Sequence, residues 1–298
     1  MKIILGTAQL GLDYGITNKN GKPDINTALQ IIKTALDNNI IDFDTARGYG
    51  DSEKIIGIAK EKFTNMNIIT KLDPLKDINE FSKRDDIIDK VKKSIDNSLK
   101  FLKINKINTL LLHRFSHYSN KIIWDYLLNL KKNKIIERLG VSVYYVEEAI
   151  AALQDKEIKH IQLPINILND SWFCDEFLKL VKKRDDVIIH CRSIFLQGIL
   201  ISSKDKWPNL DNINSEEYVD KLDKLISIFN FNNKIELCLS YIKSIEWING
   251  LLMGVDNVLQ LEENIKLFSI RKLKKDEVDL VRNIFKNVPQ NLLNPSMW

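Results

Sequence analysis

The chain has 298 residues, of which 44% are hydrophobic and 28% charged, and this balance excludes a disordered protein. Its 44 basic and 40 acidic side chains leave a net charge of +4, which is too even to indicate nucleic acid or a membrane surface as a partner. Neither a CxxC pair, a signal-peptide pattern nor an apolar stretch of about 20 residues is evident, so we expect a cytoplasmic protein.

Short apolar runs alternate with longer amphipathic ones from the first residue onward. The apolar runs predict strands at Lys2–Leu5, Ile40–Asp44, Asn67–Lys71, Thr109–His113, Glu137–Val143, Ile161–Pro164, Val187–Arg192 and Gly250–Met253. The amphipathic runs predict helices at Ile25–Asn38, Ser52–Phe63, Asp86–Leu102, Lys121–Lys132, Val146–Leu153, Trp172–Lys182, Glu217–Phe229, Ile235–Ile245, Leu259–Phe268 and Lys275–Phe285, with an irregular stretch at Phe195–Ser215.

Eight strands that alternate with helices are the pattern of a (β/α)₈ TIM barrel, an α/β fold. An open doubly wound sheet is the alternative, but for a dinucleotide it needs a GxGxxG after the first strand, where this chain reads GTAQLGLDYG. No linker or internal repeat is evident. We therefore predict one barrel domain over residues 1–298.

Polar residues stand where the predicted strands end, and the carboxyl ends of barrel strands share one face of the fold. After the second strand the chain reads FDTARGYGDSE, in which Ser52 is the expected N-cap of the next helix. The polar residues at the strand ends are Thr7, Asp44 with Tyr49, Lys71, His113, Ser142, Gln162 and Arg192.

Asp44, Tyr49, Lys71 and His113 together suit acid catalysis on a carbonyl group. A free tyrosine has a pKa near ~10, and an adjacent ammonium lowers it. The carboxylate would keep the lysine charged and in place, and the histidine would orient the carbonyl oxygen. Because no side chain can deliver a hydride, this chemistry implies a cofactor and a small-molecule carbonyl substrate.

The chain resembles the aldo-keto reductase family in a series of stretches that follow the family's order. They are LGTAQLG (5–11), FDTARGYGDSEKIIG (43–57), IITKL (68–72), LLLHR (110–114), GVS (140–142), SIFLQGIL (193–200) and GLLMGVDNVLQLEENI (250–265). The resemblance implies a barrel that binds an extended nicotinamide cofactor without a Rossmann domain. It also implies a catalytic tetrad of Asp44, Lys71, His113 and, as general acid, Tyr49.

The resemblance further implies the cofactor contacts. Ser142 and Gln162 match positions that hold the nicotinamide carboxamide, and Arg192 stands where many members place an aromatic ring that stacks on the nicotinamide. A guanidinium plane can stack as well. The other matched positions are Thr7, Ser193, Phe195, Gln197, Gly198, Gly254, Asp256, Gln260, Glu263 and Asn264.

The last strand and the helix after it bear on the choice of cofactor. Many members that use NADPH carry Lys or Arg there for the 2′-phosphate, and none stands at the matching positions of this chain. Asp256 would repel a phosphate and could accept a hydrogen bond from a ribose hydroxyl. We therefore expect either NAD(H) or NADP(H) to bind, with NAD(H) preferred.

Other functions account for parts of this pattern. A cofactor-binding sensor or regulatory subunit with little turnover would need the fold but not Tyr49 and Lys71 together. A barrel lyase or isomerase could form a Schiff base on Lys71 but has no use for a cofactor stretch after the last strand. His113 and His117 lack the glutamate of HExxH and lie at a strand end, so we predict no metal site.

The loops after the predicted strands indicate the class of substrate. They are moderately polar, with Arg114, Ser116, His117 and Asn169, which favours a sugar-like carbonyl compound. The stretch SIFLQGIL and the tail NPSMW resemble a bacterial branch of the family that is associated with polysaccharide or nucleotide-sugar pathways. Trp172 either lines the substrate cleft or packs a helix, and the sequence leaves both open.

Overall fold

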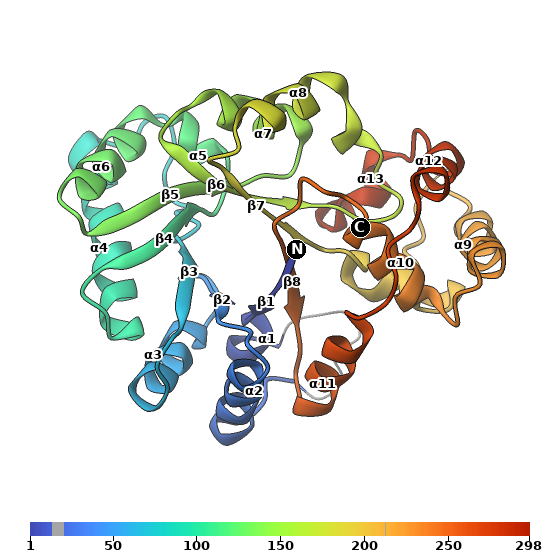
Figure 1. The fold of residues 1–298 in the computed structure, drawn as a ribbon. Coiled ribbons are helices and arrows are strands. Elements are labelled where there is room, and N and C mark those ends of the chain that lie inside the picture. The colour runs from blue at the N-terminus through green and yellow to red at the C-terminus, as the bar shows by residue number, and fades with distance from the viewer. Residues whose placement is uncertain (14–20, 212) are drawn as a thin grey trace.

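The computed structural model describes residues 1–13, 21–211 and 213–298. Its strands are parallel and pair in chain order, and β8 returns to β1 to close a barrel (Figure 1). They are β1 (Lys2–Gly6), β2 (Asp42–Asp44), β3 (Asn67–Lys71), β4 (Ile107–Leu112), β5 (Ile136–Ser142), β6 (Ile158–Pro164), β7 (Ile188–Arg192) and β8 (Gly250–Gly254). The predicted (β/α)₈ barrel is confirmed, and the open sheet was the wrong alternative.

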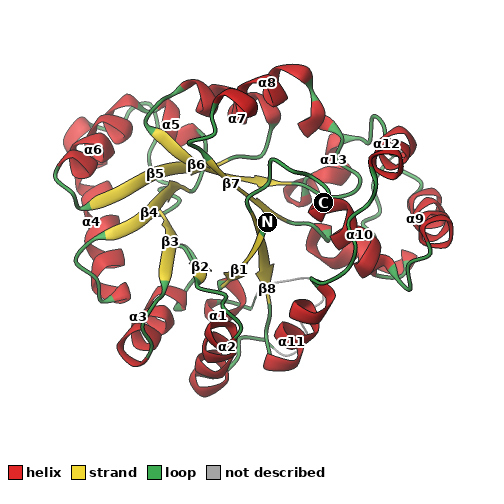
Figure 2. Ribbon diagram, in the orientation of Figure 1, coloured by secondary structure: helices red, strands yellow, loops and turns green. Residues whose placement is uncertain are grey.

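Helices surround the strands, as Figure 2 shows in red around yellow. Those of eight or more residues are α2 (Ile25–Asp37), α3 (Ser52–Lys62), α4 (Arg84–Leu102), α6 (Lys121–Lys132), α7 (Val146–Gln154), α8 (Asp175–Lys183), α9 (Ser215–Phe229), α10 (Lys234–Lys243), α11 (Val258–Leu267) and α12 (Lys275–Ile284). Within the described residues, no helix combines the length and the apolar character that crossing a membrane requires.

The helix α2 shows why these segments fold as they do. The Asp24 carboxylate caps it by accepting a hydrogen bond from the Thr27 backbone N–H at 2.9 Å. Its apolar residues recur every three or four positions, so one face of the helix is buried against the barrel, namely Ala28, Ile31, Ile32 and Ala35.

Some predicted boundaries were wrong near the strand ends. β4 ends at Leu112, so His113 begins the following loop. The predicted helix Trp172–Lys182 is divided into a 3₁₀ turn, Ser171–Phe173, and α8, because Cys174 between them is extended. Trp172 is fully buried and packs edge-on against Phe177 with ring centroids 5.6 Å apart, so it packs the core.

The sequence did not reveal three helices of four residues, because one turn is too short to show a period. They are α1 (Ala8–Gly11), α5 (Ser116–Ser119) and α13 (Gln290–Leu293). The irregular stretch after β7 contains two 3₁₀ turns, Leu196–Ile201 and Lys204–Lys206, and the start of α9.

The core has an outer and an inner part. The outer part fills the space between strands and helices, and it includes Cys191, which is fully buried. Inside the barrel, Ile4, Ile69 and Leu111 form a small apolar cluster with Leu252. Because side chains alternate along a strand, the next inward positions toward the carboxyl ends include Lys71 on β3, and the interior there is polar.

Candidate active site

A buried ion pair lies at the carboxyl ends of β2 and β3. The Lys71 Nζ is 2.5 Å from Asp44 Oδ1 and donates a second hydrogen bond to the Thr45 carbonyl at 3.1 Å. The Gln162 side-chain amide, from β6, donates to Asp44 Oδ2 at 2.7 Å. Asp44, Lys71 and Gln162 are each at most 1% exposed, so the structure brings these three predicted residues together out of contact with solvent.

The charge of Lys71 depends on its neighbours. Burial alone lowers the pKa of Lys71, because it penalises the charged ammonium. The attraction of Asp44 and of the Tyr49 phenol outweighs burial and raises that pKa above its ordinary value of 10.5. The site therefore holds a permanent buried cation at neutral pH.

Tyr49 and His113 complete the cluster. Tyr49 lies on the turn between β2 and α3, with the Lys71 Nζ 4.8 Å from its ring centroid. The His113 ring meets it edge-on, with centroids 5.7 Å apart. Burial, followed by the positive charges of Lys71 and Arg192, lowers the pKa of His113 to about 3. The imidazole is therefore neutral, and its Nδ1 has no hydrogen-bond partner among the described residues.

Close backbone packing shapes the turn that carries Tyr49. A Cβ on Gly11 would lie 2.0 Å from the Tyr49 carbonyl oxygen, so only glycine fits there. Gly50 has a φ of +54°, and a Cβ on it would lie 2.3 Å from the Gly11 carbonyl oxygen. These contacts leave one path for the chain between β2 and α3.

The expected N-cap at Ser52 was wrong. Asp51 is the N-cap of α3, and its side chain makes no capping hydrogen bond. The Ser52 hydroxyl instead donates to the Thr7 carbonyl at 2.9 Å and lies within hydrogen-bond distance of the Thr7 and Thr45 hydroxyls. It therefore ties the ends of β1 and β2 together, which a local sequence pattern cannot show.

Two of the predicted cofactor residues are buried in the barrel wall. Thr7 is fully buried, and its hydroxyl donates to the Asp44 carbonyl at 2.8 Å. Its side chain therefore bonds to the protein and does not reach the surface of the site. Ser142 is 3% exposed at the end of β5, where it pairs in register with Gln162.

Arg192 lies at the end of β7, partly buried. Its guanidinium donates to the Val143 carbonyl at 3.2 Å and stacks on Tyr144, 4.5 Å from the ring centroid. Its charge also lowers the pKa of His113, so the guanidinium acts on the buried cluster electrostatically. Sequence reasoning missed Tyr144.

The loop after β7 has an unusual backbone. Ser193, Leu196, Gln197 and Gly198 all have positive φ, between 47° and 97°. Three of these are not glycine, and residues held in this region carry strain that tends to gather at functional sites. Ser193, Phe195, Gln197 and Gly198 were all predicted to contact the cofactor, and this strained loop joins them.

The predicted cofactor residues after β8 surround the start of α11. Asn257 caps this helix by accepting from the Gln260 N–H at 2.9 Å, and its side chain donates to Asp256 at 2.8 Å. Gln260 in turn accepts from the Asp256 N–H at 3.2 Å. Farther along α11, Glu263 is exposed and Asn264 is half-buried.

Two polar residues that lie near the end of β8 were not identified from the sequence. Asn257 precedes an apolar run, which is a detectable N-cap signal, although the helix was predicted to begin at Leu259. Gln9, from α1, lies against Gly254, where a Cβ would be 2.3 Å from its Oε1. No sequence signal pointed to Gln9.

One unpaired atom indicates what the buried cluster is built to bind. Gln162 Oε1 is buried without a hydrogen-bond partner among the described residues, and leaving such an acceptor unpaired is costly. A carboxamide N–H from a ligand would satisfy it. The residues therefore fit a nicotinamide, with the strained loop and the α11 start available for the rest of a dinucleotide.

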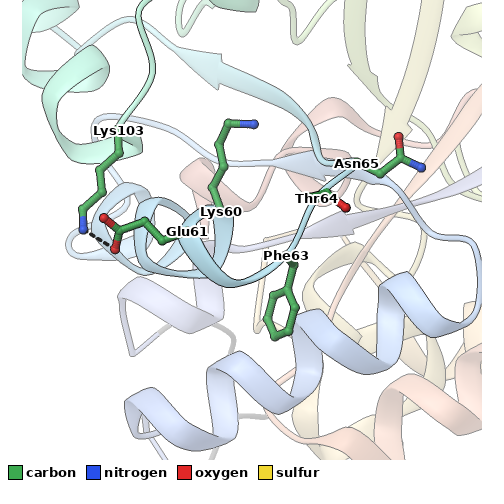
Figure 3. A pocket seen from close by; sticks show the side chains of 6 residues that line it. All are labelled: Lys60, Glu61, Phe63, Thr64, Asn65 and Lys103. Atoms are coloured by element: carbon green, nitrogen blue, oxygen red, sulfur yellow. Dashed lines mark ion pairs between the residues drawn. The ribbon is translucent and has the colours of Figure 1, made fainter.

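Two pockets lie at different ends of the barrel. The pocket in Figure 3 lies beside the amino end of β3 and is lined by Lys60, Glu61, Phe63, Thr64, Asn65 and Lys103. It is far from the strand ends that carry the cluster. Another pocket lies between the loops after β5, β6 and β7 and the chain end, and it is lined by Tyr144, Tyr145, Pro164, Asn169, Arg192, Ser193, Gln290, Leu293, Asn294 and Pro295.

A metal centre finds no support in the part of the chain that the structure describes. No group of three or more His, Cys, Asp or Glu side chains there could hold an ion. His117 lies on the short helix α5, buried. Burial, followed by the charge of Arg114, lowers the pKa of His117.

Comparison with known proteins gives a consistent result. The model of the aldo/keto reductase family matches residues 2–286. No curated protein matches the chain. An aldo-keto reductase from Bacillus halodurans, solved in its holo form, superposes with a TM-score of 0.75 at 19% identity, over 96% of this chain and 93% of that one.

A glycerol dehydrogenase from Gluconobacter oxydans superposes with a TM-score of 0.71 at 22% identity, over 98% of this chain and 93% of that one. At such identities the structural likeness shows the shared fold, whereas the family match extends over nearly the whole sequence.

Proposed function

The chain belongs to the aldo/keto reductase family and is an NAD(P)-dependent oxidoreductase of carbonyl compounds, and on that premise we propose that it reduces a sugar-like aldehyde or ketone with Tyr49 as general acid. The observation that carries the proposal is the buried Asp44–Lys71 pair beneath the Tyr49 ring. A positioned acid beside a fixed cation is what protonation of a carbonyl oxygen requires.

Each residue of the cluster has a distinct part in this reaction. Tyr49 donates its phenolic proton to the carbonyl oxygen, and the Lys71 ammonium stabilises the negative charge that remains on the tyrosine. Asp44 and Gln162 hold Lys71 in place. The neutral His113 donates an N–H to the carbonyl oxygen and orients it. When bound, the reduced nicotinamide supplies the hydride.

We propose NADH as the preferred cofactor. Gly254–Asn264 contains no Lys or Arg, and Asp256 at the start of α11 would repel a 2′-phosphate. Fluorescence titration with NADH and NADPH should therefore show tighter binding of NADH, and Asp256→Arg should raise the affinity for NADPH. A tenfold preference for NADPH in the wild type, about 1.4 kcal/mol, would contradict this.

The polar pocket beside the cluster favours a hydroxylated substrate. Asn169, Arg192, Ser193, Gln290 and Asn294 on its walls offer hydrogen-bond groups, and the other lining residues are two tyrosines, two prolines and Leu293. The similarly folded protein from Gluconobacter is a glycerol dehydrogenase, which is compatible with a small polyhydroxylated substrate here.

The test is NADH oxidation by the purified protein with glyceraldehyde, a pentose, benzaldehyde and a steroid ketone. We expect turnover of the hydroxylated compounds at a higher kcat/KM than the others. A preference for the steroid or the aromatic aldehyde would overturn the substrate class, and tight NADH binding without turnover of any carbonyl would overturn the reaction.

A further inference from the structure

A second ion pair, between the partly buried Arg47 and the fully buried Glu53, lies close to the proposed acid. The Arg47 Nη1 is 2.7 Å from Glu53 Oε2, and the Glu53 side chain is 0% exposed. The Thr70 hydroxyl donates to the other carboxylate oxygen at 2.7 Å. The Arg47 guanidinium also stacks on Phe101 of α4, 4.6 Å from the ring centroid. Both carboxylate oxygens of Glu53 are therefore bonded to the protein.

This ion pair spans the turn that carries Tyr49. Arg47 precedes Tyr49 by two residues, and Glu53 follows it in the first turn of α3. The backbone N–H of Arg47 donates to the Lys71 carbonyl at 3.1 Å, and that of Thr45 donates to the Ile69 carbonyl at 2.8 Å. The turn is thus fastened to β3, the strand that carries Lys71.

Successive residues of a strand face opposite sides, and on β3 side chains of both sides make polar contacts near Tyr49. Lys71 points into the barrel and pairs with Asp44. Its neighbour Thr70 bonds to Glu53 of α3. A displacement of α3 along β3 would therefore change the position of Tyr49 relative to the Lys71 ammonium.

Stability alone does not account for a charged pair at this place. Buried ion pairs are often no more stabilising than apolar side chains of similar volume. α3 already buries Ile55, Ile56 and Ala59 against its surroundings. The Glu53 carboxylate also fixes a position: one oxygen bonds to Arg47 of the turn and the other to Thr70 of β3, so the turn is held relative to the strand.

We propose that Glu53 is a positioning residue for the reaction: through Arg47 and Thr70 it holds the Ala46–Gly50 turn so that the Tyr49 hydroxyl stays beside the Lys71 ammonium. The inference rests on the proposed function, in which Tyr49 is the acid.

The test begins with Glu53→Gln, which keeps the size of the side chain and removes its charge. We expect kcat to fall about tenfold or more, because small misplacements of a reacting group are costly. The KM for the carbonyl compound and the Kd for NADH should stay near wild type, and the solvent deuterium isotope effect on kcat should rise as proton transfer becomes slower. Thr70→Val should give a smaller change of the same kind.

A matched control is available elsewhere in the chain. Arg271 pairs with Glu277 at 2.7 Å and stacks on Phe231 at 4.7 Å, so the same three residue types meet near α12 in a more exposed place. Glu277→Gln should leave kcat and the isotope effect unchanged. Unfolding curves of all variants show which are folded at the assay temperature, and if Glu53→Gln does not fold, Thr70→Val decides.

A measurement without substrate separates this inference from the proposed function. In protein labelled with ¹³C-tyrosine, the Tyr49 signal, assigned by its loss in Tyr49→Phe, should move in Glu53→Gln and Thr70→Val while most other tyrosine signals do not. An unmoved Tyr49 signal, or wild-type kcat in both variants, would overturn the inference. If the wild type reduces no carbonyl, the proposed function fails, and the NMR signal still shows whether Glu53 holds the turn.

Discussion

The barrel interior holds two buried polar clusters of contrasting character. The mouth cluster, Asp44, Lys71 and Gln162, lies at the carboxyl ends of the strands, and its charges are paired. The histidine pair, His160 and His190, lies two residues deeper on β6 and β7 with ring centroids 4.3 Å apart. All four of its ring nitrogens lack a hydrogen-bond partner among the described residues.

The two clusters are equally buried but differ in charge. Burial raises the cost of a charge in both, yet Asp44 and Tyr49 reverse this effect at Lys71 and raise its pKa. Within the described part of the chain, His160 and His190 have no such carboxylate partner, and burial lowers the pKa of both, to about 3 for His190. A counter-ion, and not depth, therefore decides which buried group stays charged.

The largest expected difference between the clusters is in activity. Tyr49→Phe, which removes the acid beside the mouth cluster, should lower kcat about a hundred- to ten-thousand-fold. His190→Leu should leave kcat within a fewfold of wild type. Steady-state kinetics with NADH and an active aldehyde checks both, with the Kd for NADH as the control for an intact site. Equal losses of kcat in Tyr49→Phe and His190→Leu would contradict the proposed difference between the two clusters.

Stability should respond next most strongly, at the mouth cluster. Asp44→Asn leaves the Lys71 ammonium buried without its counter-ion, which should cost about 3–5 kcal/mol of unfolding free energy. The double variant Asp44→Leu with Lys71→Met should recover most of that loss while remaining inactive. Urea unfolding at neutral pH measures both, and a single variant as stable as wild type would show that the pair is not coupled.

The pH dependence of stability should separate the clusters further. The folded pKa of His190, about 3, lies below its ordinary value of 6.5. Between these two pH values the unfolded chain therefore binds a proton at His190 that the folded chain does not bind. Full stability is therefore expected above about pH 6.5, with a loss of about 1.4 kcal/mol per pH unit for each such histidine as the pH falls toward 3. The raised pKa of Lys71 adds no slope there, because its contribution is lost only at alkaline pH.

Urea unfolding at pH 7.0 and 5.5 tests this sign. His190→Leu should reduce the acid loss by about 1.3 kcal/mol over that interval. His113→Leu should reduce it similarly, because the pKa of His113 is also about 3, but should also impair catalysis. An unchanged slope in His190→Leu would show that the imidazole is protonated in the folded state.

A further prediction concerns the space around the histidine pair. A Cβ on Gly250 would lie 2.2 Å from Ile4 Cδ1 and 2.8 Å from His190 Cδ2, both side-chain atoms. Gly250→Ala should therefore cost about 1–3 kcal/mol, and Ile4→Val should relieve part of it. Gly140→Ala should cost more and resist relief, because its Cβ would meet the His160 carbonyl oxygen at 2.2 Å. Thermal unfolding of these variants ranks them.

Much of the mouth cluster, and its neighbour His113, could be predicted from the sequence. Asp44, Lys71 and His113 each stand at or just after a strand end, and the barrel order brings such ends to one face. Ser52 and Thr7 could not be assigned in this way, because their hydroxyls bond to each other across 45 residues of sequence.

The sequence by itself determined the number and order of the strands and the residue types at their ends. Periodicity and strand ends are local properties, so a single chain displays them. Only the tertiary structure decided which polar groups meet, such as Gln162 with Asp44 across 118 residues, and which of them stay charged. Partner and charge depend on burial and on neighbours that lie close in space but far apart along the chain.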